Sequence, residues 1–343
     1  MRIFTSLAII ASIFFTSKTI AQDFETAVGY MSYIGQQQEN IVKKYLSYTS
    51  AAAHGKKARK VDNLRKKLLE EVQESRMNIS GMPSFKGDKS YRDSGVSFLK
   101  LYYSVLNEDY DKILNMEDVA EQSYDLMEAY MLAKEMASDK LAEASSRLGE
   151  AQAVFAKNNN INLLENDSKL NQKMKEVSSV NKYYNEIYLI FFKPYKQEIF
   201  LLDAITRKDI TAIEQNRSAM SNYAKEGIEK LKSISAFNGD GSVKMATTAM
   251  LNFYIREAEK MTDVTTFLLA QEKFDKYQKE FQKKSSKSKD DVNEYNKQVN
   301  EVNKLLNKYN ASNSELNKER QATLNDYNKA VDKFFAEHTP RHR

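Results

Sequence analysis

The motif Phe-x-Gly-Asp-x-Ser occurs twice in this chain, as Phe85-Lys86-Gly87-Asp88-Lys89-Ser90 and as Phe237-Asn238-Gly239-Asp240-Gly241-Ser242, 152 positions apart. In each copy Gly permits a turn with positive φ, Asp favours a local turn, and Ser is a preferred cap for a following helix. Downstream, segment 98–102 matches segment 250–254 at the same spacing. Because these matches agree in order and spacing, we interpret the chain as one helical unit that occurs twice.

The composition predicts an all-α fold. The 343 residues include only ten Gly, three Pro and no Trp, and residues with high helix propensity are abundant. Apolar residues recur at helical spacing along most of the chain. A capping box formed by Ser90 and Asp93 is expected to start the helix after the first motif. The predicted helices cover residues 24–53, 56–79, 90–106, 116–157, 167–207, 209–234, 242–309 and 314–337, with 283–290 either a solvated turn of helix or a local break.

Two tandem bundles of four helices are the predicted architecture, because a repeat of about 150 residues is the size of a domain. The first bundle is expected to cover residues 22–165 and the second residues 166–343. A long central helix over 167–207 joins them and contains the most apolar run of the chain, Ile187–Leu202, which Pro194 is expected to kink. A coiled-coil-like seam is predicted at Val292, Tyr295, Val299, Val302, Leu306 and Tyr309, which are alternately three and four residues apart.

The N-terminus predicts export. Arg2 precedes a mostly apolar stretch, 3–15, and the small residues Thr19 and Ala21 suit signal-peptidase cleavage after Ala21. Residues 1–21 are therefore interpreted as a signal peptide, with the mature chain in the periplasm or at the cell surface. No later segment has the length and apolarity of a membrane span. The chain has no Cys, which excludes disulfides and a lipidated cysteine and favours a bacterial source.

The charge balance, 52 Lys and Arg against 47 Asp and Glu, gives no indication of nucleic acid or a membrane as a partner, and no nucleic acid is predicted. Two basic runs, at 56–67 and 283–289, suit anionic lipid or glycan. Acidic residues lie within or directly beside both runs, so a solvated helix face is the preferred interpretation.

No motif predicts catalysis, a metal or a cofactor. A calcium-binding loop would need ligands where the second motif has Ala236 and Thr247. The histidines, His54, His338 and His342, stand in no metal-binding pattern. We therefore predict no catalytic, cofactor-binding or metal-binding residues, no cofactor and no enzymatic activity. The two motifs are given a structural role, carried by Phe85, Gly87, Asp88, Ser90, Phe237, Gly239, Asp240 and Ser242.

The aromatic residues are the remaining candidates for binding, with 20 Tyr and 17 Phe in the chain. At helical spacing such residues are more often core, but in a groove they can stack on a sugar or a flat ligand. The candidates for an aromatic groove between the bundles are Tyr102, Tyr188, Phe191, Tyr195 and Tyr254.

A leader ending in Ile20-Ala21-Gln22, followed by a Cys-free, Lys-, Asn- and Tyr-rich duplicated helical bundle, resembles uncharacterised exported proteins of Bacteroidetes. It is also similar to the leptospiral-type family of surface proteins of unknown function. The resemblance implies an exported, surface-associated protein and transfers no site residues. Imelysin-like exported helical proteins are a second comparison, but their Gly-x-His-x-x-Glu signature is missing, because His54 is followed by Gly55-Lys56-Lys57.

These observations predict an exported, non-enzymatic helical protein that binds or scaffolds at the cell envelope or surface. Its expected partner is an envelope or surface protein or a glycan, with no nucleic acid. The alternative is a small-ligand binding protein that uses the aromatic groove between the bundles.

Overall fold

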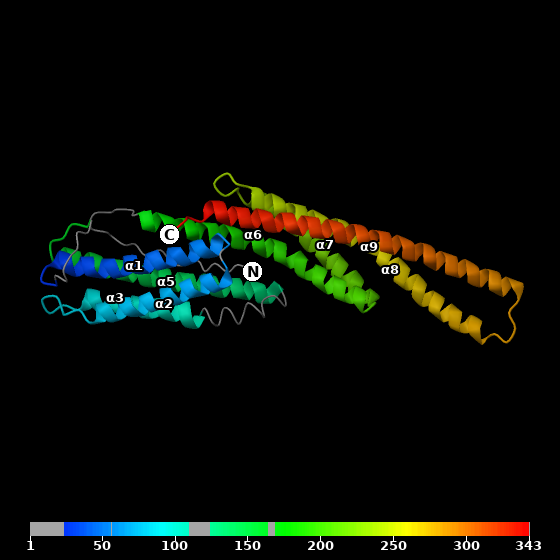
Figure 1. The fold of residues 1–343 in the computed structure, drawn as a ribbon, viewed down its shortest axis with the longest axis horizontal. Coiled ribbons are helices and arrows are strands. Elements are labelled where there is room, and N and C mark those ends of the chain that lie inside the picture. Colours follow the sequence, from blue (N-terminus) through cyan, green and yellow to red (C-terminus); the bar gives the residue numbers. More distant parts are fainter. Residues whose placement is uncertain (1–23, 56, 110–123, 164–168, 343) are drawn as a thin grey trace. The chain divides into compact units, whose positions relative to one another are not determined.

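The computed structural model describes residues 24–55, 57–109, 124–163 and 169–342, and in these ranges the fold is helical apart from two isolated bridges (Figure 1). The predicted all-α class is confirmed. The predicted signal peptide lies outside the described residues. The helices are α1 (Ala27–Ala53), α2 (Ala58–Ser80), α3 (Ser90–Ser104), the π-helical turn η1 (Val105–Asp109), α5 (Tyr124–Asn158), α6 (Lys169–Thr206), α7 (Ile210–Ser233), α8 (Ser242–Lys283) and α9 (Lys289–His338).

One predicted helix boundary is wrong. A helix end is predicted between residues 309 and 314, but α9 is continuous there. The chain instead breaks at 284–288, within the stretch 283–290 where a local break is one of the two predicted alternatives. The polar stretch 310–313 stays helical because packing of the residues around it overrides its own weak helix propensity. Leu316, for example, is buried. At the real break, Ser288 and Asp291 cap the new helix: the Ser288 hydroxyl accepts from the Asp291 N–H at 3.1 Å, and the Asp291 carboxylate accepts from the Ser288 N–H at 2.9 Å.

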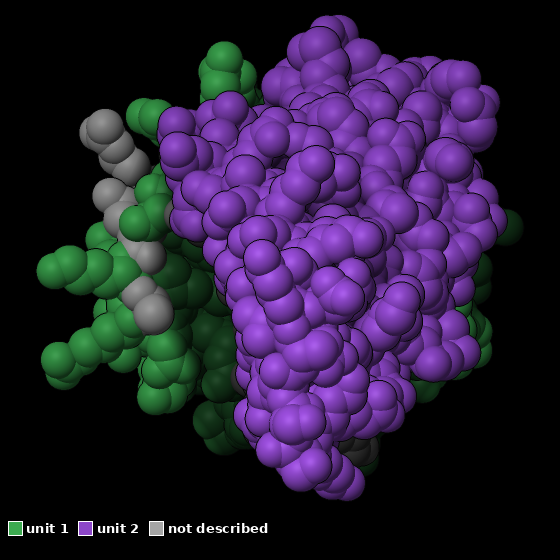
Figure 2. Space-filling view, turned by 90° about the vertical axis from the view of Figure 1, so that its right-hand side faces the viewer, with its two compact units in different colours: residues 1–185, 332–343 green, residues 186–331 purple. Residues whose placement is uncertain are grey.

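The chain divides into two compact units, which Figure 2 colours separately. Unit 1 comprises the described residues up to Asn185 and those from Asp332, and unit 2 comprises 186–331. Helices α6 and α9 therefore contribute to both units. The first part of α6 belongs to unit 1 because Met174 and Val177 are buried in the core that α1, α2, α3 and α5 form.

An aromatic cluster lies at the centre of unit 1. Tyr30 stacks on Phe155 with ring centroids 5.4 Å apart, and Phe85 and Tyr91 also contact Phe155. The Tyr30 hydroxyl donates to the Pro83 carbonyl at 2.9 Å. The first Phe-x-Gly-Asp-x-Ser motif is thus attached to the core at both of its flanks.

The two motifs have the same local structure. Each Phe bridges its Asp through a pair of backbone hydrogen bonds, and φ is positive at the two residues between them: 49° and 84° at Lys86 and Gly87, 50° and 86° at Asn238 and Gly239. The expectation that Ser caps the following helix is corrected. Asp88 accepts from the Ser90 N–H at 2.8 Å, and Asp240 from the Ser242 N–H at 2.7 Å, so each Ser enters as the first helical residue.

The similarity extends beyond the motifs. Arg92 donates to the Met82 carbonyl at 2.9 Å, and Lys244, 152 positions later, donates to the Ile234 carbonyl at 2.6 Å. Burial recurs at the same spacing. The paired buried positions are Leu68 and Met220, Val72 and Ala224, Ser75 and Gly227, Ile79 and Leu231, Tyr91 and Val243, Gly95 and Thr247, Phe98 and Met250, Leu99 and Leu251, Tyr102 and Tyr254, Val105 and Glu257, and Leu106 and Ala258.

In unit 2, α8 and α9 form a long antiparallel hairpin that Figure 1 shows extending past the turn between α6 and α7. Its distal part is held by aromatic contacts. Phe267 stacks on Tyr309 at 5.3 Å, Phe281 stacks on Tyr295 at 4.5 Å, and Gln278 donates to the Tyr295 hydroxyl at 2.9 Å. Among the described helices, none combines the length and apolarity that a bilayer crossing requires.

Candidate functional site

Over residues 256–263 of α8, charged side chains join the two helices of the α8–α9 hairpin. On its solvent side, Arg256 pairs with Glu319, Lys260 pairs with Glu315, and Asp263 binds the Lys308 ammonium at 2.7 Å. The Ser312 hydroxyl also donates to Asp263, at 2.8 Å. These contacts hold the pKa of the Asp263 carboxyl below its usual value, chiefly through the Lys308 hydrogen bond.

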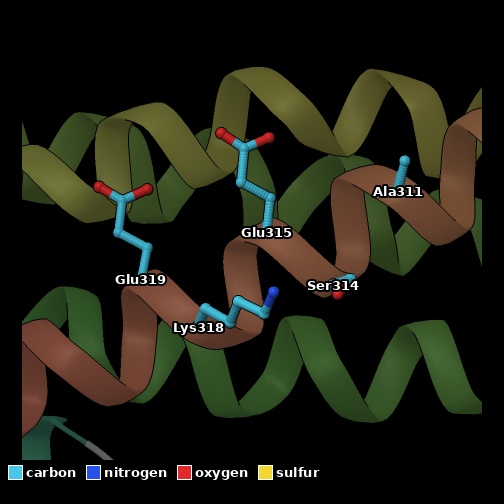
Figure 3. A pocket seen from close by; sticks show the side chains of 5 residues that line it. All are labelled: Ala311, Ser314, Glu315, Lys318 and Glu319. Atoms are coloured by element: carbon cyan, nitrogen blue, oxygen red, sulfur yellow. The ribbon is translucent and has the colours of Figure 1, made fainter.

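A depression of about 610 Å³ lies beside these ion pairs. It is lined by Ala311, Ser314, Glu315, Lys318 and Glu319. Figure 3 shows the Glu315 and Glu319 side chains directed toward α8, while the Lys318 side chain runs along α9 in the direction of Ser314. Both glutamates are already in ion pairs with α8. The depression therefore presents compensated charges, and its chemistry is that of a polar surface rather than of a reactive centre.

A second set of charges lies inside unit 2, where α6, α8 and α9 meet. Arg320 on α9 donates to Glu198 on α6 and to Glu257 on α8. The Glu257 side chain is 0% exposed, Glu198 is 5% exposed and Arg320 is 18% exposed. The guanidinium also lies over the Phe253 ring, 5.8 Å from its centroid. Two buried carboxyl groups thus share one partly buried cation, so ionising both leaves a net negative charge in the interior.

The protonation of this cluster follows from its burial. Removal from water raises the pKa of Glu257 to about 8, and the nearby Glu198 charge adds to the rise while Arg320 opposes it. The pKa of the Tyr254 phenol is raised well above its usual value for the same reasons, burial first and the two carboxyl groups next. Near neutral pH the Glu257 carboxyl therefore holds a proton for much of the time, and Arg320 faces about one negative charge.

The positions of the first half of the chain that correspond to the two glutamates are uncharged. Val105, 152 positions before Glu257, is buried. Helix α1 ends at Ala53 and α6 at Thr206, a spacing of 153, so Glu198 corresponds to the buried Tyr45. At these two pairs of positions, only unit 2 has buried carboxyl groups.

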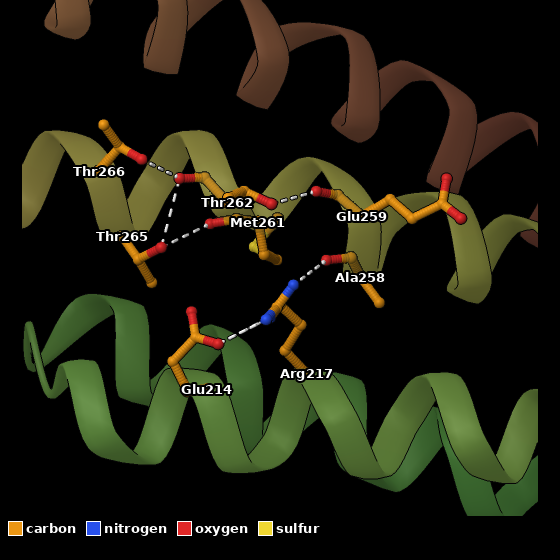
Figure 4. Close-up of polar contacts among 8 residues, drawn as sticks. All are labelled: Glu214, Arg217, Ala258, Glu259, Met261, Thr262, Thr265 and Thr266. Atoms are coloured by element: carbon orange, nitrogen blue, oxygen red, sulfur yellow. Dashed lines mark hydrogen bonds and ion pairs between the residues drawn. The ribbon is translucent and has the colours of Figure 1, made fainter.

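Polar contacts between α7 and α8 position the same stretch of α8 (Figure 4). Arg217 pairs with Glu214 and donates to the Ala258 carbonyl at 3.4 Å, one residue after Glu257. Farther along α8, the Thr262 hydroxyl donates to the Glu259 carbonyl and the Thr266 hydroxyl to the Thr262 carbonyl. These hydroxyl groups satisfy the backbone of their own helix, so they contribute structure rather than a binding surface.

The predicted groove residues lie in the interior of their own units. Tyr102 in unit 1 is 1% exposed, and in unit 2 Tyr254, Phe191 and Tyr188 are 0%, 4% and 8% exposed. Phe191 stacks on the half-buried Tyr195 at 5.3 Å and on Tyr327 at 4.3 Å. Aromatic side chains packed in this way contribute to the hydrophobic core. Their role in ligand binding stays a prediction.

Sequence reasoning missed Glu198, Glu257 and Arg320. A signal was present, because Glu257 lies three residues after Tyr254 and four before Met261, in phase with the buried face of α8. A charged residue in a core position is either paired or protonated when the chain folds. Its partners come from two other helices, which the spacing along α8 alone does not identify.

The chain matches no protein-family model, no curated protein and no solved structure.

Proposed function

We propose that this protein is an exported, non-enzymatic helical scaffold that binds a partner at the cell envelope through its α8–α9 hairpin. The observation that carries the proposal is the hairpin itself. Its two helices contact each other through ion pairs and aromatic stacking, and their outward faces are exposed.

The dimensions of the hairpin suit a binding element. Helix α8 has 42 residues, which corresponds to about 60 Å at 1.5 Å per residue. In the distal part the stretch 271–301 has no fully buried residue, although it remains helical on both sides of the 284–288 turn. A long, solvated pair of helices offers contact area on its exposed faces, and stable protein–protein interfaces use about 800 Å² per partner.

Export is the second part of the proposal, with residues 1–21 removed after Ala21 and the mature chain in the periplasm or at the surface. Its support is the sequence pattern of the leader. The similarity to uncharacterised exported proteins of Bacteroidetes and leptospiral type belongs to the same proposal, and the proposed partner is an envelope or surface protein or a glycan.

Internal duplication is the third part, in the form of two related helical bundles. Its support is the shared turn geometry of the two motifs, the matching bonds of Arg92 and Lys244, and the recurrence of buried positions at one spacing. One fold can carry different functions on different surfaces, so the two units need not share a role.

Site-specific photo-crosslinking tests the binding role. A photoreactive residue at Lys273 or Lys297, both exposed on the distal hairpin, is expected to give a discrete adduct in envelope fractions of the native cell. The matched control is Lys66, an exposed residue of α2 in unit 1, which is expected to give none. Equal labelling from all three positions, or no adduct from the hairpin, would contradict the proposal.

A further inference from the structure

The turn of the α8–α9 hairpin concentrates positive charge. We define the arm tip as residues 279–289, which contain Lys279, Lys283, Lys284, Lys287 and Lys289 against the single acid Glu280. All five lysine side chains are exposed. The next two residues, Asp290 and Asp291, offset part of this charge, and Asp291 pairs with Lys284 at 2.6 Å.

The arm tip is an ordered turn. Besides the reciprocal bonds of Ser288 and Asp291, the Lys287 ammonium donates to the Lys284 carbonyl at 3.2 Å and lies 5.4 Å from the Phe281 ring centroid. The hydrogen bond from Lys284, followed by those from Ser288, lowers the pKa of the Asp291 carboxyl to about 2. The lysines are therefore presented from a fixed platform.

Helix stability accounts for only part of this charge. Lys283 lies in the last turn of α8, where a cation favours the helix dipole, and Lys287 donates to the carbonyl of the C-cap residue Lys284. Lys289 opens α9, however, where the dipole disfavours a cation. In the part of the chain that the structure describes, Lys279, Lys283 and Lys289 have no ion-pair partner.

We propose that the arm tip binds the surface of a bilayer that contains anionic phospholipid, an inference that rests on the proposed envelope role and names the partner of the hairpin's end. Lysine ammonium groups are point charges that suit diffuse attraction to a charged plane, and the tip has no arginine for bidentate phosphate recognition.

The chemistry favours lipid over nucleic acid or glycan. Stacking on bases or sugars needs exposed aromatic faces. Phe281 lies within the tip, and Tyr277 and Tyr295 lie beside it. The three rings are stacked on one another, and Phe281 is also covered by Lys287. A convex turn can touch a plane with its end, whereas a polymer chain is better held in a groove.

Vesicle binding by the full chain tests the proposal. Co-sedimentation would compare vesicles of equal parts phosphatidylglycerol and phosphatidylcholine with vesicles of phosphatidylcholine alone. Residues 1–21, which contain Arg2 and Lys18, are common to every protein compared, so any binding through that segment is the same for the unmodified chain and for both variants. The tip variant carries Lys279→Gln, Lys283→Gln, Lys287→Gln and Lys289→Gln, and the matched flank variant carries Lys273→Gln, Lys297→Gln, Lys304→Gln and Lys318→Gln.

Each lysine near such a surface contributes about fivefold in affinity. The tip variant is therefore expected to lose a factor of about 100 or more on anionic vesicles, and the flank variant less than about tenfold. Added salt is expected to weaken the binding of the unmodified chain. Circular dichroism is expected to show unchanged helix content in both variants, since all eight side chains are exposed.

Three results would overturn the inference: equal affinity for the two vesicle types, equal loss in the tip and flank variants, or preferential binding to a soluble polyanion such as heparin with no vesicle binding. None of these results touches the crosslinking outcome at Lys273 and Lys297, so failure of the lipid inference is distinguishable from failure of the proposed scaffold role.

Discussion

The Glu257 carboxyl lies where three helices meet, and its environment opposes its ionisation. Burial opposes ionisation, Glu198 adds a second negative charge, and Arg320 compensates for only one of the two. Because one residue from each of α6, α8 and α9 takes part, the protonation of a single side chain is coupled to the packing of the hairpin on α6.

This coupling predicts a pH dependence of stability. The pKa of Glu257 is about 8 when folded and near 4.5 when unfolded, so between these values the folded chain holds a proton that the unfolded chain releases. Its contribution is complete below about pH 4.5 and is lost as pH rises through 8, with a limiting slope of about 1.4 kcal/mol per pH unit. Glu257→Gln, which cannot ionise, is expected to flatten the free energy of unfolding measured by urea denaturation between pH 5 and 8.

The matched control is Glu319→Gln, which removes a partly exposed carboxyl from the same hairpin and should retain the slope of the unmodified chain. Parallel pH profiles for the unmodified chain and Glu257→Gln would show that the cluster does not bind the proton.

At the scale of elements, the turns that join α2 to α3 and α7 to α8 depend on backbone conformations that most residues avoid. Gly239 has φ of 86°, whereas Gly241, two residues later, has φ of −101°. No heavy atom lies within 4 Å of a Cβ added at either position. The two glycines therefore differ in backbone strain and not in available space.

Gly239→Ala is expected to lower the free energy of unfolding by about 1–2 kcal/mol, because an alanine is forced into the left-handed region. Gly241→Ala is expected to change it by less than about 0.5 kcal/mol. Thermal unfolding of both variants checks the pair, and equal destabilisation would refute the assignment of the cost to φ.

The capping boxes show what sequence could and could not predict about the elements. Ser90 with Asp93 and Ser288 with Asp291 have the same spacing, but only the second pair makes the reciprocal bonds. In the first, Asp88 has already taken the Ser90 N–H through the preceding turn. Helix positions followed from apolar spacing, whereas the choice of cap depended on the path by which the chain enters the helix.

At the scale of the whole molecule, the turns of the two halves should be interchangeable if the halves share an origin. Asn238→Lys with Gly241→Lys converts the second motif into the first, and φ at both positions is close to that of the residues copied. The free energy of unfolding is expected to change by less than about 0.5 kcal/mol. Asn238→Val, which places a β-branched side chain at positive φ, is the contrast and should cost more than about 1 kcal/mol. A loss of that size in the double variant would argue against equivalent turns.

Most of the helical plan could be predicted because it rests on local patterns. Residues 24–53, 56–79 and 209–234 were expected to be helical, and α1, α2 and α7 lie there with ends within a few residues. The continuous α9 and the cluster of Glu198, Glu257 and Arg320 could not be predicted, since both depend on packing between residues distant in sequence.

The difference between the buried positions of the two halves also bears on how a chain with two similar sequences avoids pairing the wrong segments while it folds. Tandem copies are prone to such mispairing. If a helix of the first half took the place of its counterpart against α8, Tyr45 would stand where Glu198 stands, and Glu257 with Arg320 would lose one member of its set. In that arrangement Arg320 would lose its hydrogen bond to Glu198. A lost hydrogen bond between charged groups costs about 1.5–3 kcal/mol, which favours the correct partner over the exchanged one during refolding.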